Sequence, residues 1–381
     1  MFTGISKGAV VDRTPVIGIV GSRGAYGLWL AQFFRERMGL QVIGRDMAGD
    51  TALSERALIE RADVLVFSAP IRATPALIAD YVRIADGAER GRFWLDITSI
   101  KSTPVSALLA SQAEVVGLHP MCAPPPAPTL KGRALVVCEA RVDAWRPWLQ
   151  RFLDALQADC MAAEPEQHDR VMALVQGMVH ACHMAQGALW RELAPAVGGL
   201  DAISPFHTVG YELDLAVTQR MLAGNPAIYQ DIQFENPHVA PMLDRLAVHV
   251  ASLRDLVREG SEPAREQMRR DWLEGSASYF GERSLADGSQ HFERMAYLLA
   301  DLTGAACLEV MMPADRPGTL RALLSVFEQH GINFDSIHSS RVSNGELRFR
   351  LGLDEATRAE DLAAAVVAME DAGIARRLPT A

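Results

Sequence analysis

Polar side chains able to do acid–base chemistry follow two apolar runs in the first third of the chain. Ser99 and Lys101 lie just after the run WLDI, and His119 lies just after VVGL. Both runs read as buried strands, and the carboxyl ends of neighbouring parallel strands meet at the ligand-binding edge of a sheet. A neutral imidazole there could accept a proton from a hydroxyl while hydride leaves the same carbon, and Ser99 could orient the ring. An isolated histidine can also be a satisfied structural residue.

A glycine-rich turn near the start of the chain predicts a dinucleotide site. The stretch VIGIVGSRGAYGLWLAQFF reads as strand, turn and helix. Against the Rossmann fingerprint G-x-G-x-x-G, Ser22 takes the first glycine position, Gly24 and Gly27 fill the other two, and Gly21 directly precedes them. Gly24 would let the backbone approach a pyrophosphate, and Gly27 would let the helix pack on the strand. A glycine-rich turn without a ligand is the alternative.

A carboxylate at the end of the second expected strand bears on the choice of cofactor. Asp46 lies 19 residues past Gly27 and ends the run QVIGRD. It could accept hydrogen bonds from both ribose hydroxyls of NAD and would repel a 2′-phosphate, with which the neighbouring Arg45 could pair. The sequence therefore favours NAD over NADP. We also assign Ser68 and Pro70, which follow the run VLVF, to the cofactor site.

The helix expected at 167–193 carries a polar stripe. Its members, at spacings of seven, four and three, are Asp169, Gln176, His180 and His183. Such a stripe on an otherwise apolar helix needs partners or a wet cleft, and polar groups satisfied within the core are the alternative. No carboxylate or cysteine completes a ligand set with the two histidines, so we expect no metal site.

A sheet of short strands must position these residues. Strands are expected at 15–20, 41–44, 64–69, 92–97, 115–118 and 134–138. Several are apolar on successive residues, which is typical of strands covered on both faces. We therefore expect an α/β, Rossmann-like, doubly wound parallel sheet over residues 1–142. Strand signals stop from Trp145, so residues 143–302 are expected to form an all-helical substrate and dimerisation domain.

Residues 303–381 show a third pattern. The runs CLEVMMP, PGTLRALLSVFEQHG, INFDSIHSSRV, ELRFRLGLD and RAEDLAAAVVAMEDAG read as strand, helix, strand, strand and helix. This order predicts a small α+β module, ferredoxin-like if a last short strand follows Gly373.

Composition excludes several classes of function. The 381 residues suggest two or three domains, and 49% hydrophobic with 22% charged residues predicts a packed core. A net charge of −10 without a Lys/Arg run argues against a nucleic-acid partner. Five cysteines without a CxxC read as reduced thiols of a cytoplasmic protein. We expect no signal segment and no membrane span, because no stretch reaches the ~20 apolar residues that a span needs.

The motifs GSRGAYG, VFSAPIRAT, DITSIK and GLHPM, in this order, resemble the prephenate dehydrogenases of tyrosine biosynthesis. The resemblance continues through QHDRVMALVQGMVHACHMA and YELDLAVTQRMLAGNP and covers roughly residues 15–285. It implies a homodimeric enzyme that converts prephenate to 4-hydroxyphenylpyruvate by oxidative decarboxylation while NAD is reduced.

The resemblance also implies roles for single residues. His119 would take the proton from the ring hydroxyl, and Ser99 would support it. His180 would line the site, and Arg220, shortly before an Asn-Pro pair, would bind a substrate carboxylate. From position alone, Arg220 could simply compensate a helix dipole, although a forked guanidinium suits a dicarboxylate. We also assign Lys101 to substrate binding.

The run LEVMMPADRPGTLRALLSVFEQHGINFDSIHSSR resembles an ACT domain, the amino-acid-binding regulatory module. The resemblance implies that the turn D-x-P-G-T-L holds a ligand carboxylate with free backbone N–H groups. The effector, tyrosine first, would contact Asp315, Gly318, Leu320, Ser339 and Arg341. A degenerate module that only mediates dimer contacts is the alternative.

The loop MCAPPPAPTLKG departs from the family pattern, because Ala123 and four prolines stand where members commonly carry Gly and acidic or Ser/Thr residues. The role of residues 123–128 therefore stays open, and arogenate or an amino-substituted prephenate remain alternative substrates. A β-hydroxyacid-type dehydrogenase would use a lysine on the helix 167–193, which contains none. A non-enzymatic regulator that senses a dinucleotide and an amino acid is the last alternative, and NADH formation from prephenate would discriminate between them.

Overall fold

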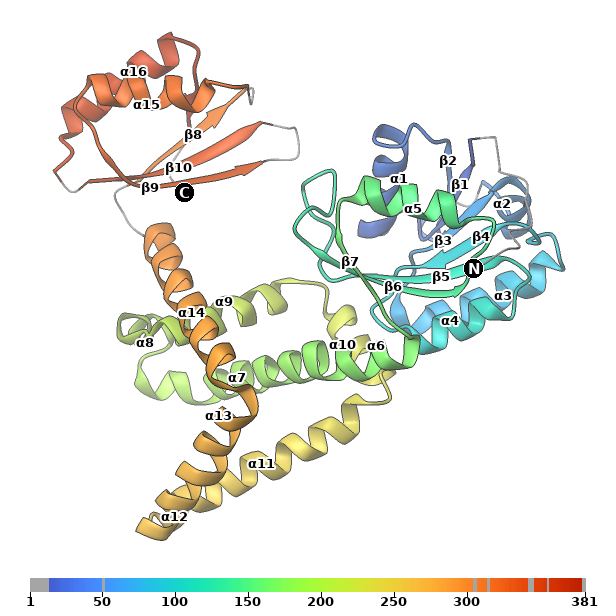
Figure 1. The fold of residues 1–381 in the computed structure, drawn as a ribbon, viewed down its shortest axis with the longest axis horizontal. Helices are drawn as coiled ribbons and strands as arrows, with labels where there is room; N and C mark the ends of the chain where they lie inside the picture. Colours follow the sequence, from blue (N-terminus) through green and yellow to red (C-terminus); the bar gives the residue numbers. More distant parts are fainter. Residues whose placement is uncertain are drawn as a thin grey trace, which may run out of the picture. The chain divides into compact units, whose positions relative to one another are not determined.

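The computed structural model describes residues 14–49, 52–303, 307–313, 316–341, 346–354 and 356–378 (Figure 1). Its elements form two compact units, which divide in sequence between Ser252 and Leu253. The first holds a seven-stranded sheet and the second a four-stranded one. Among the described residues, no helix combines the length and the apolar character that crossing a membrane requires.

The sheet of the first unit has the strand order β2-β1-β3-β4-β5-β6-β7. Its strands are β1 (Ile17–Val20), β2 (Val42–Arg45), β3 (Val64–Phe67), β4 (Phe93–Asp96), β5 (Glu114–Pro120), β6 (Ala134–Arg141) and β7 (Asp159–Ala162). β1 to β5 run parallel, as expected for a Rossmann-like sheet. The expectation of a wholly parallel sheet is wrong for β6, which pairs antiparallel with β5. Residues 121–133 between them contain no crossover helix, and a connection without one returns the chain antiparallel.

Helices cover both faces of this sheet. The first face carries α1 (Ala25–Glu36) and α5 (Arg146–Leu156), and the second carries α2 (Glu55–Arg61), α3 (Thr74–Ala85) and α4 (Ser102–Leu109). Successive strand residues enter opposite cores, which explains the continuous apolar runs in the sequence. The prediction that strand structure stops at Trp145 is wrong, because α5 packs into the first core and β7 adds an edge strand.

From Pro165 the first unit is helical. α6 (Pro165–Met172), a π-helical turn (Ala173–Met178) and α7 (Val179–Leu193) follow without a break, which confirms the long helix expected at 167–193. The helices that follow are α8 (Leu200–Ile203), α9 (Val209–Ala223), α10 (Pro226–Glu235) and α11 (Val239–Glu259), with short 3-10 turns at Ile71–Ala73, Ala194–Val197 and Ser204–Phe206.

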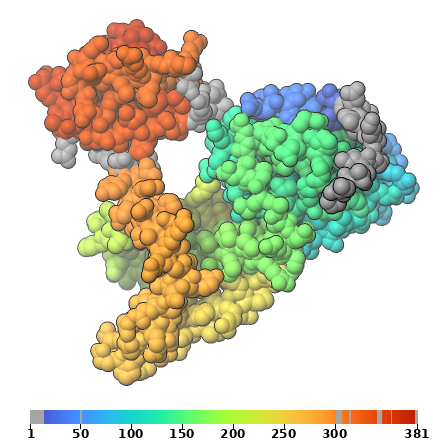
Figure 2. Space-filling model, viewed as in Figure 1, coloured from blue at the N-terminus to red at the C-terminus, as the bar shows by residue number. Residues whose placement is uncertain are grey.

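The second unit begins within α11, continues with helices and ends in a small module. Its elements are α12 (Glu262–Gln267), a π-helical turn (Met268–Glu274), α13 (Gly275–Phe280), α14 (Glu282–Thr303), β8 (Cys307–Met312), α15 (Thr319–Gln329), β9 (Phe334–Arg341), β10 (Leu347–Leu353), α16 (Ala359–Asp371) and β11 (Arg376–Arg377). The sheet order β11-β8-β10-β9 and the short last strand confirm the ferredoxin-like expectation. The described residues of β8 to β11 with α15 and α16, coloured orange to red, form one rounded body (Figure 2).

Candidate active site

His119, near the end of β5, belongs to a buried chain of three polar side chains. Its Nδ1 lies 2.9 Å from Nε2 of His168 in α6, and Nδ1 of His168 lies 2.8 Å from Oδ1 of Asp169. His119 and His168 each expose 2% of their surface and Asp169 exposes none. We call this chain the Asp169–His168–His119 relay.

The start of α4 holds the Asp169 end of the relay. Oδ1 of Asp169 accepts the backbone N–H of Lys101 at 2.8 Å, and Oδ2 accepts that of Ser102 at 2.9 Å. The amino end of a helix favours a negative charge. Burial alone would raise the pKa of Asp169, but hydrogen bonds from His168, Ser102 and Lys101 outweigh it and lower the pKa. Asp169 is therefore an ionised acceptor at neutral pH.

The ionised carboxylate decides which nitrogen carries each proton in the relay. Because a carboxylate only accepts, neutral His168 carries its proton on Nδ1 and accepts at Nε2. His119 then donates from Nδ1 to His168, which leaves His119 Nε2 unprotonated. The amide nitrogen of Gln176 lies 3.4 Å from this Nε2 and fits it as a donor. This hydrogen-bond network thus presents Nε2 of His119 as a base.

The surroundings of His119 keep it neutral until it takes up a proton. Burial lowers the pKa of His119 well below the usual 6.5, the neighbouring His168 ring and the charge of Lys101 lower it further, and Asp169 opposes them. Once protonated, the imidazolium donates a charge-assisted hydrogen bond to His168, which Asp169 supports from behind. The relay therefore suits a group that accepts a proton only during a reaction.

The π-helical turn presents further polar groups beside His119. Gln176 lies within this turn and His180 follows it in α7. Such turns are frequent at functional sites. Gln176 Oε1 and His180 Nδ1 are buried and have no hydrogen-bond partner among the described residues. The His180 ring meets Tyr229 of α10 edge-on, with ring centroids 5.0 Å apart. Because buried polar atoms rarely stay unpaired, these two suit a polar substrate.

Ser99 and Lys101 do not take the places expected of them. Within the described part of the chain, no hydrogen bond joins Ser99 to His119, and His168 orients the ring instead. The side chain of Lys101 is fully buried, pairs with Asp96 and donates to the Leu118 carbonyl at 2.7 Å. The expectation that Lys101 contacts substrate is therefore corrected, because the carboxylate of Asp96 holds its ammonium in the core.

Arg220 lies in the last turn of α9, as expected, with its side chain exposed. α9 runs alongside α7, since a Cβ placed on Gly187 would lie 3.2 Å from the methyl carbon of Thr218. Among the residues that the structure describes, Arg220 makes no ion pair, which leaves its guanidinium available for a substrate carboxylate. Within the described ranges of the chain, no hydrogen bond links it to the Asp169–His168–His119 relay.

The glycine-rich turn between β1 and α1 has no room for a side chain at Gly21 or Gly27. Gly21 has a φ of +82°, and a Cβ there would lie 2.1 Å from the carbonyl oxygen of Ser68. A Cβ on Gly27 would lie 2.1 Å from the carbonyl oxygen of Gly21. Gly24 is the N-cap of α1 and has no side chain that could accept a hydrogen bond from the backbone N–H groups of the first turn. The backbone N–H groups of this helix end fit the pyrophosphate of a dinucleotide.

Asp46 contacts this turn and has its carboxylate already oriented. Its Oδ2 accepts the backbone N–H of Arg23 at 2.9 Å, and its Oδ1 accepts that of Ala48 at 2.9 Å. Each oxygen keeps acceptor capacity for a ribose hydroxyl. Arg45 instead donates from Nε to Glu55 at 2.9 Å and from Nη1 to a backbone carbonyl at 2.7 Å. The ion pair holds Arg45 at α2, and Asp46 is the residue that borders the turn.

The other expected cofactor residues lie at the same edge of the sheet. The backbone N–H of Ser22 donates to the Arg45 carbonyl at 3.3 Å, and that of Ser68 donates to Val20 at 2.8 Å. Pro70 precedes the 3-10 turn Ile71–Ala73. The structure therefore brings the ends of β1, β2 and β3 together around the glycine-rich turn.

The proline-rich loop after β5 is tied to α1. The Tyr26 hydroxyl donates to the Cys122 carbonyl at 2.5 Å, and Trp29 Nε1 donates to the Ala127 carbonyl at 3.1 Å. Burial raises the pKa of Tyr26, so the hydroxyl remains a donor. The loop that follows His119 is thus held by the helix that follows the glycine-rich turn.

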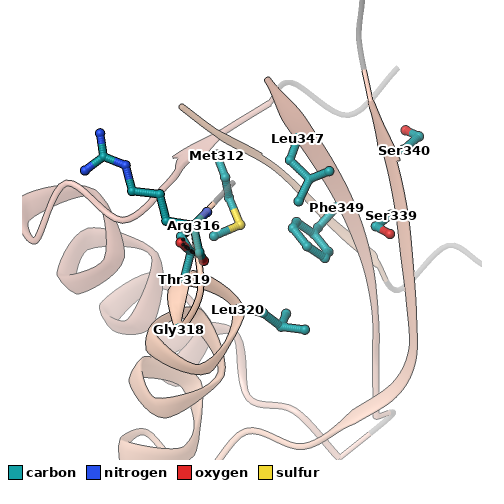
Figure 3. A pocket seen from close by; sticks show the side chains of 9 residues that line it. All are labelled: Met312, Arg316, Gly318, Thr319, Leu320, Ser339, Ser340, Leu347 and Phe349. Atoms are coloured by element: carbon teal, nitrogen blue, oxygen red, sulfur yellow. Dashed lines mark hydrogen bonds between the residues drawn. The ribbon is translucent and has the colours of Figure 1, made fainter. Parts of the chain in front are cut away.

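A pocket of about 460 Å³ lies in the module of the second unit. It is lined by Met312, Arg316, Gly318, Thr319, Leu320, Ser339, Ser340, Leu347 and Phe349 (Figure 3). Met312, Leu347 and Phe349 converge from β8 and β10, whereas the guanidinium of Arg316 points away from them (Figure 3). Of the expected effector residues, Gly318, Leu320 and Ser339 line this pocket. Asp315 and the side chain of Arg341 lie outside the described residues.

Comparison with known proteins finds two domain types in the chain. Residues 164–270 match the family model described as the prephenate dehydrogenase dimerization domain, and residues 308–370 match that of the ACT domain. The "Probable arogenate/prephenate dehydrogenase" of Methanocaldococcus jannaschii is 26% identical over 260 residues, 64% of this chain. This match and the dimerization-domain match make the chain similar to the prephenate/arogenate dehydrogenases. The chain spans 56% of the length of the M. jannaschii relative.

Two further proteins align with this chain over more of their own length. The 4-amino-4-deoxyprephenate dehydrogenase of Streptomyces pristinaespiralis is 29% identical over 283 residues, which are 67% of this chain and 88% of that protein. The crystal structure of prephenate dehydrogenase from A. aeolicus, in complex with hydroxyphenyl propionate and NAD+, aligns with 70% of this chain and 99% of that chain. Its TM-score of 0.53 at 19% identity shows a shared fold.

His168 is the site residue that the sequence did not single out. It stands directly before Asp169 in the run QHDRV, on the helix whose polar stripe was recognised. A histidine next to a carboxylate in the first turns of that helix is the signal that could have found it.

Proposed function

We propose that this chain catalyses the NAD-dependent oxidative decarboxylation of prephenate to 4-hydroxyphenylpyruvate in tyrosine biosynthesis. The observation that carries the proposal is the buried chain of hydrogen bonds from Asp169 through His168 to His119, from which the unprotonated Nε2 of His119 follows. The carboxyl ends of β5 and of β1, where the glycine-rich turn begins, share one edge of the sheet. A neutral base at the edge that holds a dinucleotide cradle suits the removal of a hydroxyl proton during hydride transfer.

The surroundings of each site residue indicate its role in the reaction. Bound NAD would take the hydride that leaves the hydroxyl-bearing ring carbon of the substrate. His119 Nε2 accepts the hydroxyl proton, and the relay stabilises the imidazolium that forms. Arg220 binds a substrate carboxylate, and His180 lines the side of the site near Gln176. The ring carboxylate then leaves as CO₂, the electrons of the broken bond make the ring aromatic and reach the former hydroxyl oxygen, and this oxygen takes the proton back from His119, so the reaction is effectively irreversible.

NAD rather than NADP is the cofactor in this proposal. Asp46 offers an oriented carboxylate to the ribose hydroxyls and would repel a 2′-phosphate. Arg45, which could have bound that phosphate, is engaged by Glu55. The cradle itself supports a dinucleotide, because Gly21 and Gly27 leave no side chain at its floor.

The ring hydroxyl is the substrate feature that the relay favours. A base that accepts a hydroxyl proton suits prephenate and arogenate, which share this hydroxyl. It suits an amino-substituted relative less well, although one relative is named for 4-amino-4-deoxyprephenate. Paired assays of prephenate and arogenate, each with NAD and NADP, test the choice. Absence of NADH formation with either substrate would contradict the enzyme and favour a sensing regulator.

The decisive experiment separates chemistry from binding. His119→Asn should lower kcat by ~10²–10⁴-fold with a small change in the KM for prephenate, because a general base acts in the transition state. Arg220→Gln should chiefly raise that KM, since a contact to a carboxylate is present in ground and transition states alike. His207→Gln, at an exposed histidine of the same unit, serves as the control. A His119→Asn enzyme with near-normal turnover would remove His119 from the mechanism.

We also infer that the chain forms a homodimer through its helical region. Exposed apolar side chains recur on α7, α9 and α10, namely Val179, Leu189, Leu193, Val217, Leu222, Ile228 and Phe234. Apolar side chains gathered on a surface mark interaction sites, and the matched family model describes a dimerization domain. A solution mass of one chain, 41.5 kDa, at assay concentrations would contradict the dimer.

For the pocket of the ACT domain we propose an amino-acid effector, tyrosine first. The side chains of Met312, Leu347 and Phe349 offer an apolar wall for an aromatic ring. Gly318, with a φ of +94°, is the N-cap of α15, where backbone N–H groups suit a carboxylate. The volume of about 460 Å³ suits a ligand of this size.

A further inference from the structure

Lys101 is a fully buried cation in a chain that uses arginine almost everywhere else. Of 37 basic residues, three are lysines, Lys7, Lys101 and Lys131. The side chains of Lys101 and of its partner Asp96 expose 0% of their surface. Because desolvating two charges offsets their attraction, a buried ion pair is weak evidence for a role in stability. The charge therefore calls for a functional explanation.

Lys101 bonds the Asp169 end of the Asp169–His168–His119 relay and the strand residue that precedes its His119 end. Its Nζ donates at 2.7 Å to the carbonyl of Leu118, the residue before His119. Its backbone N–H donates at 2.8 Å to Oδ1 of Asp169. A single residue thus fixes the strand end that carries the base and the carboxylate at the far end of the relay.

The neighbours of Lys101 favour a lysine at this position. Asp96 Oδ1, which accepts from Nζ, also accepts the backbone N–H of Thr98 at 3.0 Å and its hydroxyl at 2.6 Å. Its Oδ2 is buried and has no partner among the described residues. A Cβ on Gly117 would lie 3.1 Å from Cδ of Lys101, so the stem of the side chain fills the space that a larger residue at 117 would need. A planar guanidinium is wider than an ammonium and would fit this space less well.

We propose that Lys101 is a positioning residue that sets the basicity of His119, since its buried positive charge disfavours the imidazolium while its two hydrogen bonds hold the relay in place. The inference rests on the proposed role of His119 as base. The charged and titratable groups around His119 are His168 and Asp169 from α6, Lys101 before α4, and Asp96 from β4 behind Lys101. Burial, the neighbouring His168 ring and the charge of Lys101 lower the pKa of His119, and Asp169 opposes them.

The test is the pH profile of kcat/KM for prephenate in the full-length protein. Lys101→Met removes the charge, so the acidic limb of the profile should move to higher pH by roughly one unit, the low end of the effect of a nearby charge. Lys101→Arg keeps the charge and disturbs the fit, so kcat should fall while the limb stays in place. Lys131→Met, at an exposed lysine, should change neither. An acidic limb of Lys101→Met at the wild-type position overturns the proposal.

Asp96→Asn provides a second test, in which the acidic limb of the pH profile should move in the opposite direction. It removes the counter-charge and keeps the ammonium, so the acidic limb should move to lower pH, and a limb that stays or rises overturns the proposal even where Lys101→Met does not fold. The two possible failures are distinguishable. Lack of NADH formation by wild type, or normal turnover by His119→Asn, removes the proposed function. Loss of turnover in His119→Asn with an unmoved limb in the Lys101 and Asp96 variants removes this inference alone.

Discussion

Replacing His168 with leucine tests whether the relay takes part in proton transfer. The side chain of His168 is fully buried, with one ring nitrogen 2.9 Å from His119 and the other 2.8 Å from Asp169. Leucine has a similar volume and removes both contacts. Asp169 keeps its hydrogen bonds from the backbone of Lys101 and Ser102, so the carboxylate stays in place.

The size of the expected effect follows from the charge that His119 gains. A hydrogen bond to a charged group contributes ~1.5–3 kcal/mol, and about 1.36 kcal/mol corresponds to a tenfold change. His168→Leu should therefore lower kcat about 10–150-fold, because the bond to His168 becomes charge-assisted only once His119 is protonated. The KM for prephenate should change less, since this contact is strengthened in the transition state and not on binding.

The assay is the initial rate of NADH formation for wild type, His168→Leu and His168→Gln, with His207→Gln as the surface control. Glutamine can accept from His119 and donate to Asp169, so His168→Gln should recover part of the loss. A thermal unfolding curve for each variant checks that it is folded. A folded His168→Leu enzyme with a kcat close to wild type would refute the relay as a part of the chemistry.

Three further outcomes are expected. Asp46→Ser should raise the activity with NADP relative to NAD, and a wild type that already prefers NADP would make Arg45 the determinant instead. At saturating tyrosine the apparent affinity for prephenate should weaken about 5–150-fold, and Ser339→Phe, which fills the pocket of the ACT domain, should abolish this effect; equal inhibition of both proteins would place tyrosine in the active site. Because burial lowers the pKa of His119 below 6.5, the unfolded state binds this proton more readily, so the free energy of unfolding should fall as pH drops below about 6.5 and through the folded-state pKa. Urea unfolding of wild type and His119→Asn at several pH values checks this, and an equal pH dependence of both would contradict it.

Strand positions could be predicted from the sequence, but strand direction and edge strands could not. The first six strands are recognisable in the sequence as apolar runs, because helices cover both faces of the sheet. Nothing in the composition of β6 states that it runs antiparallel, since the direction follows from the connection at 121–133. All four residues of β7 are exposed, so neither an apolar run nor an alternation marks this strand.

The site was predictable where it depends on backbone position and not where it depends on side-chain direction. His119 and the glycine-rich turn lie at strand ends, which the pattern of apolar runs locates. The partner of His119 comes from a helix 49 residues later in sequence, and the pattern could only suggest the nearby Ser99. Lys101 points into the core because it pairs there with the carboxylate of Asp96. This pairing depends on how the end of β4 and the start of α4 pack, which the sequence pattern does not give.

The π-helical turn at Ala173–Met178 gives this helix one residue that can be lost without turning its far end. A π turn holds one residue more than the α-helical path, and each residue of an α-helix advances the side chains by about 100°. A deletion of one residue within the turn would restore a regular helix and leave His180 facing Tyr229 and Gly187 facing Thr218. A deletion of one residue early in α7 would instead rotate every later side chain by about that angle and turn Gly187 away from Thr218. Homologous chains should therefore lose or gain a single residue at this turn more readily than elsewhere in the helix.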